Sequence, residues 1–223
     1  MKPSSALFFR FDDIGPLNWR SLQLIDLMET LARPYVLGVI PSALNWCVKR
    51  RLRQTRHALI FQHGTTHKNQ SGPQAPDEFP VEWGVDRITV EMRRGRHMLE
   101  NALGQPIFGY IPPWNRISSA ALQVLEQEGY KILSGDAMHP TPLLQWPVHV
   151  DVYASYRTVS VRSNEDIERE VAQYLQTTAL VGVVLHPLSM PRSRSKQLHG
   201  LLRNYASRMV SRLPWETVSC QNR

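Results

Sequence analysis

Two short apolar segments of this chain end abruptly in side chains of the kind that bind metal ions. Ala6–Phe11 is followed by two acids, and Ala58–Gln62 is followed by a His-x-x-x-His sequence. The polar residues at these two ends are Asp12, Asp13, His63 and His67. The carboxyl ends of parallel strands meet at one edge of a sheet or barrel, so we expect these residues to lie close together. A carboxylate with two imidazoles suits a divalent cation and leaves positions open for water and substrate, as metal-assisted hydrolysis requires.

Strand-like and helix-like segments alternate along the chain, which favours an α/β fold because parallel strands need a crossover element between them. The predicted strands are Ala6–Phe11, Tyr35–Ile40, Ala58–Gln62, Pro106–Ile111, Lys131–Ser134, Val148–Tyr153 and Leu180–Leu185. The predicted helices are Leu17–Ala32, Ala43–Arg53, Asp86–Ala102, Ser118–Glu128, Asn164–Thr178 and Lys196–Leu213. A length of 223 residues is ordinary for one α/β barrel, and no linker divides the chain, so residues 1–223 are expected to form a single domain.

Composition and charge exclude several other classes of protein. The apolar fraction of 42% suits a globular chain, but there is no long apolar run, so no membrane span is expected. The N-terminal sequence lacks an apolar signal region, which favours a cytoplasmic location. The net charge of +7 comes from basic residues scattered over helix faces and one loop without interleaved aromatic residues, so no nucleic-acid partner is expected. Cys47 and Cys220 lack metal-site spacing and are expected to be reduced.

Two more predicted strands end in residues that suit a catalytic site. Pro113, Trp114 and Asn115 follow one of them, and His186 follows the last. Taken singly, each strand end has an ordinary structural explanation, but their joint occurrence points to one site. The remaining histidines match no motif and are expected to be structural or exposed: His57, His97, His139, His149 and His199.

These residues resemble the motifs of the polysaccharide deacetylase family (carbohydrate esterase family 4, NodB homology domain), in particular its short, divergent members. The segments that carry the resemblance are Phe11-Asp12-Asp13, His63-Gly64-Thr65-Thr66-His67, Ile111-Pro112-Pro113-Trp114-Asn115 and Leu185-His186. The first matches the family's aromatic-Asp-Asp motif, and the second matches His-[Ser/Thr]-x-x-His with Gly64 in place of the hydroxyl residue. The third matches Arg-x-Pro-aromatic in part. The resemblance extends from about residue 6 to about residue 190.

The resemblance implies a deformed (β/α)7-type barrel with its site at the strand carboxyl ends. It implies that the metal ligands are Asp13, His63 and His67, and that the metal is most often Zn²⁺, with Co²⁺ or Ni²⁺ as alternatives. Asp12 would be the general base and His186 the general acid. Because Pro113 has no N–H, the backbone N–H of Trp114 is the candidate donor to the developing oxyanion. Substrate contacts are expected from Pro113, Trp114 and Asn115.

The chain departs from the family pattern in its third motif, because Ile111 stands where the arginine that holds the base carboxylate is expected. Arg10 or Arg116 are the candidate replacements. The acid that orients His186 is also open, with Asp136 and Asp151 as candidates.

We therefore expect a metal-dependent hydrolase that removes an acetyl group, N-acetyl more readily than O-acetyl, from a sugar or polysaccharide. The segment Lys68–Trp83 follows the second metal-ligand histidine, so it is expected to overhang the site and to leave a groove for a glycan. Two alternatives remain. One is metal-dependent hydrolysis of a non-sugar C–N amide bond, and the other is a non-catalytic glycan-binding module, which the missing arginine favours.

Overall fold

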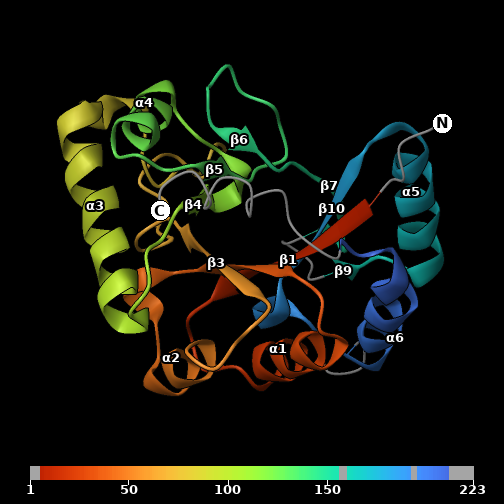
Figure 1. Cartoon of the computed structure of the whole chain (residues 1–223). Coiled ribbons are helices and arrows are strands. Elements are labelled where there is room, and N and C mark those ends of the chain that lie inside the picture. The colour runs from red at the N-terminus through yellow and green to blue at the C-terminus, as the bar shows by residue number, and fades with distance from the viewer. Residues whose placement is uncertain (1–5, 156–159, 192–194, 211–223) are drawn as a thin grey trace.

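The computed structural model describes residues 6–155, 160–191 and 195–210. Its main element is a curled sheet of eight parallel strands, with helices packed around the outside (Figure 1). The strand order is β6-β5-β4-β3-β2-β1-β10-β7. These strands are β1 (Ala6–Ile14), β2 (Tyr35–Val39), β3 (Ala58–His63), β4 (Gly109–Ile111), β5 (Ile132–Leu133), β6 (Leu144–Gln145), β7 (Val148–Asp151) and β10 (Leu180–Leu185).

The two outer strands of this sheet belong to one extended segment. β6 pairs with β5, and β7, which begins three residues later, pairs with β10. Between them, the Trp146 N–H donates to the Leu133 carbonyl (2.9 Å) and the Val148 N–H donates to the Gly135 carbonyl (2.7 Å). The segment 144–151 therefore joins the two edges of the sheet. Because β6 and β7 share one segment, the eight strands occupy seven positions around a barrel, which confirms the predicted deformed (β/α)7-type fold.

The helices are α1 (Trp19–Leu31), α2 (Trp46–Leu52), α3 (Gly84–Leu103), α4 (Ser119–Gln127), α5 (Asn164–Thr177) and α6 (Ser195–Tyr205). Short 3-10 turns are η1 (Pro41–Ala43), η2 (Val81–Trp83), η3 (Pro113–Asn115), η4 (Pro187–Ser189) and η6 (Ala206–Arg208). Side chains of Asn18, Asn45, Ser118 and Ser163 accept backbone N–H groups and so cap α1, α2, α4 and α5. None of the described helices is long and apolar enough to cross a membrane.

Two helix predictions were wrong at their ends. The helix predicted from Ala43 begins at Trp46, because η1 occupies the preceding residues and Asn45 caps the start. The helix predicted for Lys196–Leu213 ends at Tyr205. There the chain turns toward β1: Met209 forms a bridge with Leu7, and the Val210 N–H donates to the Leu7 carbonyl (3.1 Å). The last predicted helical residues, 211–213, lie outside the described part of the chain.

Some short strands were not predicted. β6 was missed, as was the antiparallel pair formed by β8 (Tyr153–Ser155) and β9 (Ser160–Val161). Cys47 is a free thiol among the described residues. Cys220 lies outside them, so the expected reduced state of both cysteines stays a prediction.

Alternation along β1 decides which of its side chains face the barrel interior. Leu7, Phe9 and Phe11 pack in the cluster between the sheet and its helices. Phe8 packs instead against the ring of Trp146 inside the barrel (ring centroids 5.9 Å apart). Since residues two apart share one face of a strand, Arg10 and Asp12 follow Phe8 into the interior. Both are buried, and this places a charged pair at the carboxyl end of the barrel.

Candidate active site

Three of the four residues found at the first two strand ends converge on one point. Asp13 Oδ1 lies 3.5 Å from His63 Nε2 and 3.4 Å from His67 Nε2. One ligand atom from each of the three side chains lies within 4.8 Å of the others. The predicted ligand set is thus brought together by β1, by the last residue of β3, and by the turn that follows it. This donor set fits a divalent cation such as zinc.

The two imidazoles can each offer a ring nitrogen to a metal, but for different reasons. His63 is buried, and its Nδ1 lies 3.0 Å from the Ile111 carbonyl, so Nδ1 carries the proton and Nε2 is left for a metal. Burial acts to lower the pKa of His63, but its interaction with Asp13 outweighs this and the pKa is raised. Burial, together with the positive charge of His63, lowers the pKa of His67 to about 4. His67 is therefore neutral near pH 7.

Asp13 is the shared partner of these histidines. Burial alone would raise its pKa, but the nearby imidazoles of His186 and His63 hold the pKa of Asp13 well below its usual range. A carboxylate that remains charged in the company of imidazoles attracts positive charge, as a metal ligand must.

Asp12 lies beside this cluster but has a different partner. Arg10 Nη2 donates to Asp12 Oδ2 (2.7 Å) and to Asn115 Oδ1 (2.8 Å), while Arg10 Nη1 donates to the Ser134 carbonyl (2.9 Å). Arg10 therefore makes the contact that was expected of the missing third-motif arginine. The second oxygen of Asp12, Oδ1, is buried and has no hydrogen-bond partner within the described residues. A buried orphan acceptor of this kind is expected where water or substrate binds.

His186 lies on the other side of Asp13. Its Nδ1 is 3.3 Å from Asp13 Oδ2, and its Nε2 is 3.9 Å from Asp151 Oδ2. The Tyr153 hydroxyl donates to the His186 carbonyl (2.9 Å), and the two rings meet edge to face. Of the two acids considered for orienting His186, Asp151 is the one nearby, whereas Asp136 is exposed.

The turn η3 brings Trp114 to the site from β4. The indole packs against the ring of His67, with centroids 4.6 Å apart, and remains 37% exposed. The N–H groups of Asn115 and Arg116 bond within the turn, whereas in the described part of the chain the Trp114 N–H meets no acceptor. Pro113 is buried behind it. Arg116, the other candidate for the missing arginine, is exposed.

Glu78 is a residue of the site region that the sequence analysis missed. It lies in the segment after His67, and its buried carboxylate accepts the backbone N–H groups of Thr65 (3.1 Å), Thr66 (2.6 Å) and His67 (3.2 Å). It thus holds the turn that carries His67, the second histidine of the predicted ligand set. The only sequence signal is an acid immediately before the apolar Phe79 within a Pro-rich loop.

The site also concentrates backbone strain. Among the described residues, the non-glycine residues with positive φ are Asp13, Ala32, His67, Trp114 and Asn115. All of these except Ala32, which ends α1, belong to the site. Left-handed conformations are costly for such residues, and they cluster at functional sites because the surrounding structure enforces them.

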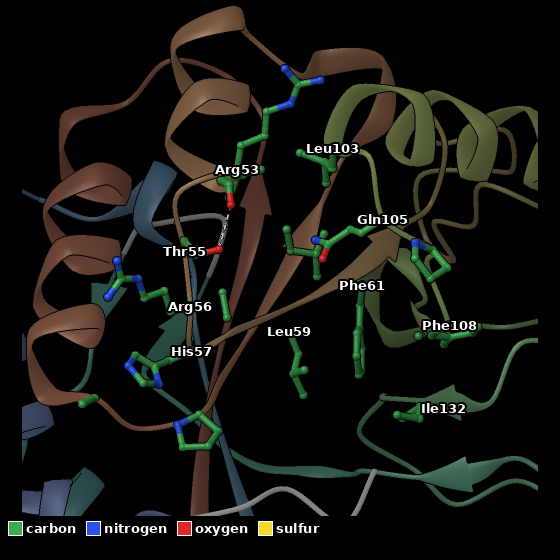
Figure 2. A pocket seen from close by; sticks show the side chains of 17 residues that line it. Arg53, Thr55, Arg56, His57, Leu59, Phe61, Leu103, Gln105, Phe108 and Ile132 are labelled. Atoms are coloured by element: carbon green, nitrogen blue, oxygen red, sulfur yellow. Dashed lines mark hydrogen bonds between the residues drawn. The ribbon is translucent and has the colours of Figure 1, made fainter. Parts of the chain in front are cut away.

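A cavity of about 590 Å³ lies at the opposite end of the barrel (Figure 2). It is lined by residues at the amino ends of β3, β4 and β5, including Leu59, Phe61 and Ile132, and by Arg53 and Arg56 beyond α2. None of the predicted site residues lines it. His57 does, and it is half-buried there.

No family model and no curated protein matches this chain. Solved structures do match. A predicted polysaccharide deacetylase from Mycobacterium smegmatis is 16% identical with a TM-score of 0.70, covering 93% of this chain and 86% of that one. A family 4 acetyl xylan esterase from Clostridium thermocellum, in complex with a cobalt ion, is 11% identical with a TM-score of 0.61, covering 97% and 85%. A family 4 pseudoenzyme from Bacillus anthracis is 11% identical with a TM-score of 0.62, covering 92% and 62%.

These likenesses establish the fold, which is that of the polysaccharide deacetylases and family 4 carbohydrate esterases. The resemblance seen in the sequence motifs is thereby confirmed at the level of the fold. The pseudoenzyme shows that this fold also occurs without catalysis. The assignment of an activity therefore depends on the site residues themselves.

Proposed function

We propose that this protein is a metal-dependent hydrolase that removes an acetyl group from a sugar or polysaccharide, with N-acetyl groups preferred over O-acetyl groups. The observation that carries the proposal is the convergence of Asp13, His63 and His67, with the unpartnered oxygen of Asp12 on one side and His186 on the other. A base, a metal-ligand set and an acid within one small region suit hydrolysis of an acyl bond.

Asp13, His63 and His67 would hold the cation, and this set of one carboxylate and two imidazoles suits Zn²⁺, with Co²⁺ or Ni²⁺ as alternatives. When bound, such a cation supplies a Lewis acid that polarises the acyl carbonyl and lowers the pKa of water. The Nδ1 bond of His63 to the Ile111 carbonyl keeps the other ring nitrogen directed at the ligand position.

Asp12 acts as the general base. Arg10 neutralises its charge and fixes Oδ2, which leaves Oδ1 to take the proton of the attacking water. Water oxygen then bonds to the acyl carbon, and the carbonyl oxygen gains negative charge. The backbone N–H of Trp114, which meets no acceptor in the described part of the chain, donates to that oxygen.

His186 acts as the general acid. It donates a proton to the leaving nitrogen as the C–N bond breaks, giving acetate and a free amine. An amine is a poorer leaving group than an alcohol unless it is protonated, so an imidazole held between two carboxylates favours the N-acetyl substrate.

Exposed aromatic side chains support a glycan as the substrate. Trp19 is 73% exposed and Trp46 is 69% exposed. Each is the first residue of a helix that follows a barrel strand, after an asparagine cap. Such helices begin at the carboxyl ends of the strands, on the same rim as Trp114. Flat, exposed indoles offer faces on which sugar rings can stack, and sugar binding would account for their exposure to solvent.

The test is metal analysis combined with acetate release. Purified protein is analysed for bound zinc, cobalt and nickel, and is then incubated with N-acetylated oligosaccharides, O-acetylated xylan and simple acetanilide. Acetate release from a sugar, lost in His63→Ala together with the metal, supports the proposal. Hydrolysis of the anilide alone favours a non-sugar amidase. Stoichiometric glycan binding without any acetate release favours a non-catalytic binding module and overturns the proposed activity.

A further inference from the structure

The buried carboxylate of Glu78 is held by the segment between the two histidine ligands. Successive backbone N–H groups of Thr65, Thr66 and His67 point at it, and the Thr66 hydroxyl also donates to it (2.8 Å). Consecutive N–H groups directed at one anion form a concave anion-binding turn. Here the anion is a side chain of the same chain, from a segment that starts directly after the second ligand.

No arginine, lysine or histidine within the described ranges forms an ion pair with Glu78. Its side chain is nevertheless buried, at 2% exposure. A buried anion is costly unless hydrogen bonds or a nearby positive charge compensate it. Neutral N–H groups provide part of that compensation, and a divalent cation held by His67 and its partners would provide more.

Gly64 is shaped to admit this carboxylate. Its φ is +61°, and a Cβ added there would lie 1.9 Å from Glu78 Oε2 and 2.7 Å from Pro113 Cγ. Any side chain at this position therefore displaces either the carboxylate or the turn that leads to Trp114. Gly64 and Glu78 thus fit each other. This fit also explains why glycine replaces the hydroxyl residue that is expected directly after His63.

We propose that Glu78 is a positioning residue for the metal centre, acting through the Thr65–His67 turn and through its negative charge. It keeps His67 in its left-handed conformation, with φ of +54°, and so keeps the second imidazole facing Asp13. The inference rests on the proposed metal site, but not on the proposed acetyl hydrolysis.

The test is the affinity of the purified, metal-stripped protein for Co²⁺ and Zn²⁺, measured by competition with a chromophoric chelator. Glu78→Gln keeps the shape of the side chain but removes its charge and one acceptor. We expect the affinity to fall about 10–100-fold, as for other groups that orient metal ligands, with an altered Co²⁺ absorption spectrum. Glu82→Gln removes a charge from an exposed neighbour and is expected to leave both unchanged.

Two more variants cover the case in which Glu78→Gln does not fold. Glu78→Asp retains the charge and is expected to bind the metal more tightly than Glu78→Gln, and Gly64→Ala is expected to weaken binding although Glu78 remains. Wild-type affinity in folded Glu78→Gln overturns the proposal, as does equal weakening by Glu82→Gln. Weakened metal binding in a protein that releases no acetate supports the role of Glu78 and rejects only the proposed activity.

Discussion

The two ends of the barrel differ in where a cavity lies and in where the backbone is strained. The amino end has the roomy cavity of about 590 Å³, while the carboxyl end has the strained residues Asp13, His67, Trp114 and Asn115. None of the predicted site residues lines that cavity. In barrels of this kind, strain and buried charge at the strand carboxyl ends are the better indication of chemistry.

The arginines at the two ends of the barrel differ in burial and in hydrogen bonding. Arg53 and Arg56 line the amino-end cavity and are exposed, so their charges remain hydrated. Arg10 at the carboxyl end is fully buried and makes four hydrogen bonds, one of them to Asp12. A buried charge is retained only where it is paired, which implies that the pair serves a specific geometry. The predictions below test this contrast.

The largest effect is expected at the base. Asp12→Asn retains the volume and can still accept from Arg10, but it cannot take a proton. We expect kcat on an accepted acetylated sugar to fall about 10²–10⁴-fold, while the metal content stays close to that of the wild type. Steady-state kinetics with elemental analysis measures both. Full activity in this variant means that another group is the base.

The next largest effect is on stability. Arg10→Met leaves the buried Asp12 carboxylate without its ion pair, so the free energy of unfolding is expected to fall by about 3–5 kcal/mol. Urea denaturation measures this. The matched control at the other end, Arg53→Met, removes an exposed charge and is expected to change stability by less than about 0.5 kcal/mol. Similar losses in the two variants would remove the contrast between the ends.

A smaller effect is expected from the amino-end cavity. Leu59→Ala removes a half-buried side chain that packs against the interior cluster, so we expect a loss of about 1–2 kcal/mol in the free energy of unfolding. Because this residue lies far from the strand carboxyl ends, kcat and metal affinity are expected to stay within about twofold of wild type. A tenfold fall in kcat would show that the amino end takes part in catalysis.

The smallest effect concerns His149, on β7. The Gly182 N–H donates to its Nδ1 (3.1 Å), which requires a neutral ring, and burial lowers the pKa of His149. The unfolded chain therefore binds a proton here at higher pH than the folded protein does. Stability is lost as the pH falls below the unfolded pKa of about 6.5. On acidification from pH 7.5 to 5.5 the melting temperature of wild type should fall more than that of His149→Asn; equal falls contradict this.

Much of the barrel, and the convergence of Asp13, His63 and His67, could be predicted from the sequence, because strand ends are marked by a change from apolar to polar residues. The role of Arg10 was one of two alternatives, and the alternation along β1 explains why it prevailed: Arg10 and Asp12 share one face of the strand. Glu78 was not predicted, because it reaches the Thr65–His67 turn through an irregular segment that carries no periodic signal. β6, β8 and β9 are too short to produce a pattern.

The pairing of β1 with β10 has a consequence for how the protein is made. The two strands lie side by side in register from Ala6 with Leu180 to Phe11 with Leu185. They are far apart in the sequence, so the ribosome makes β1 long before β10. Until β10 emerges, the apolar first strand has one unsatisfied edge, which is a template for association with other chains. His186 can join Asp13 only after β10 has been made, so we expect this end of the barrel to be completed late in folding and dilute or chaperone-assisted conditions to favour the yield of folded protein.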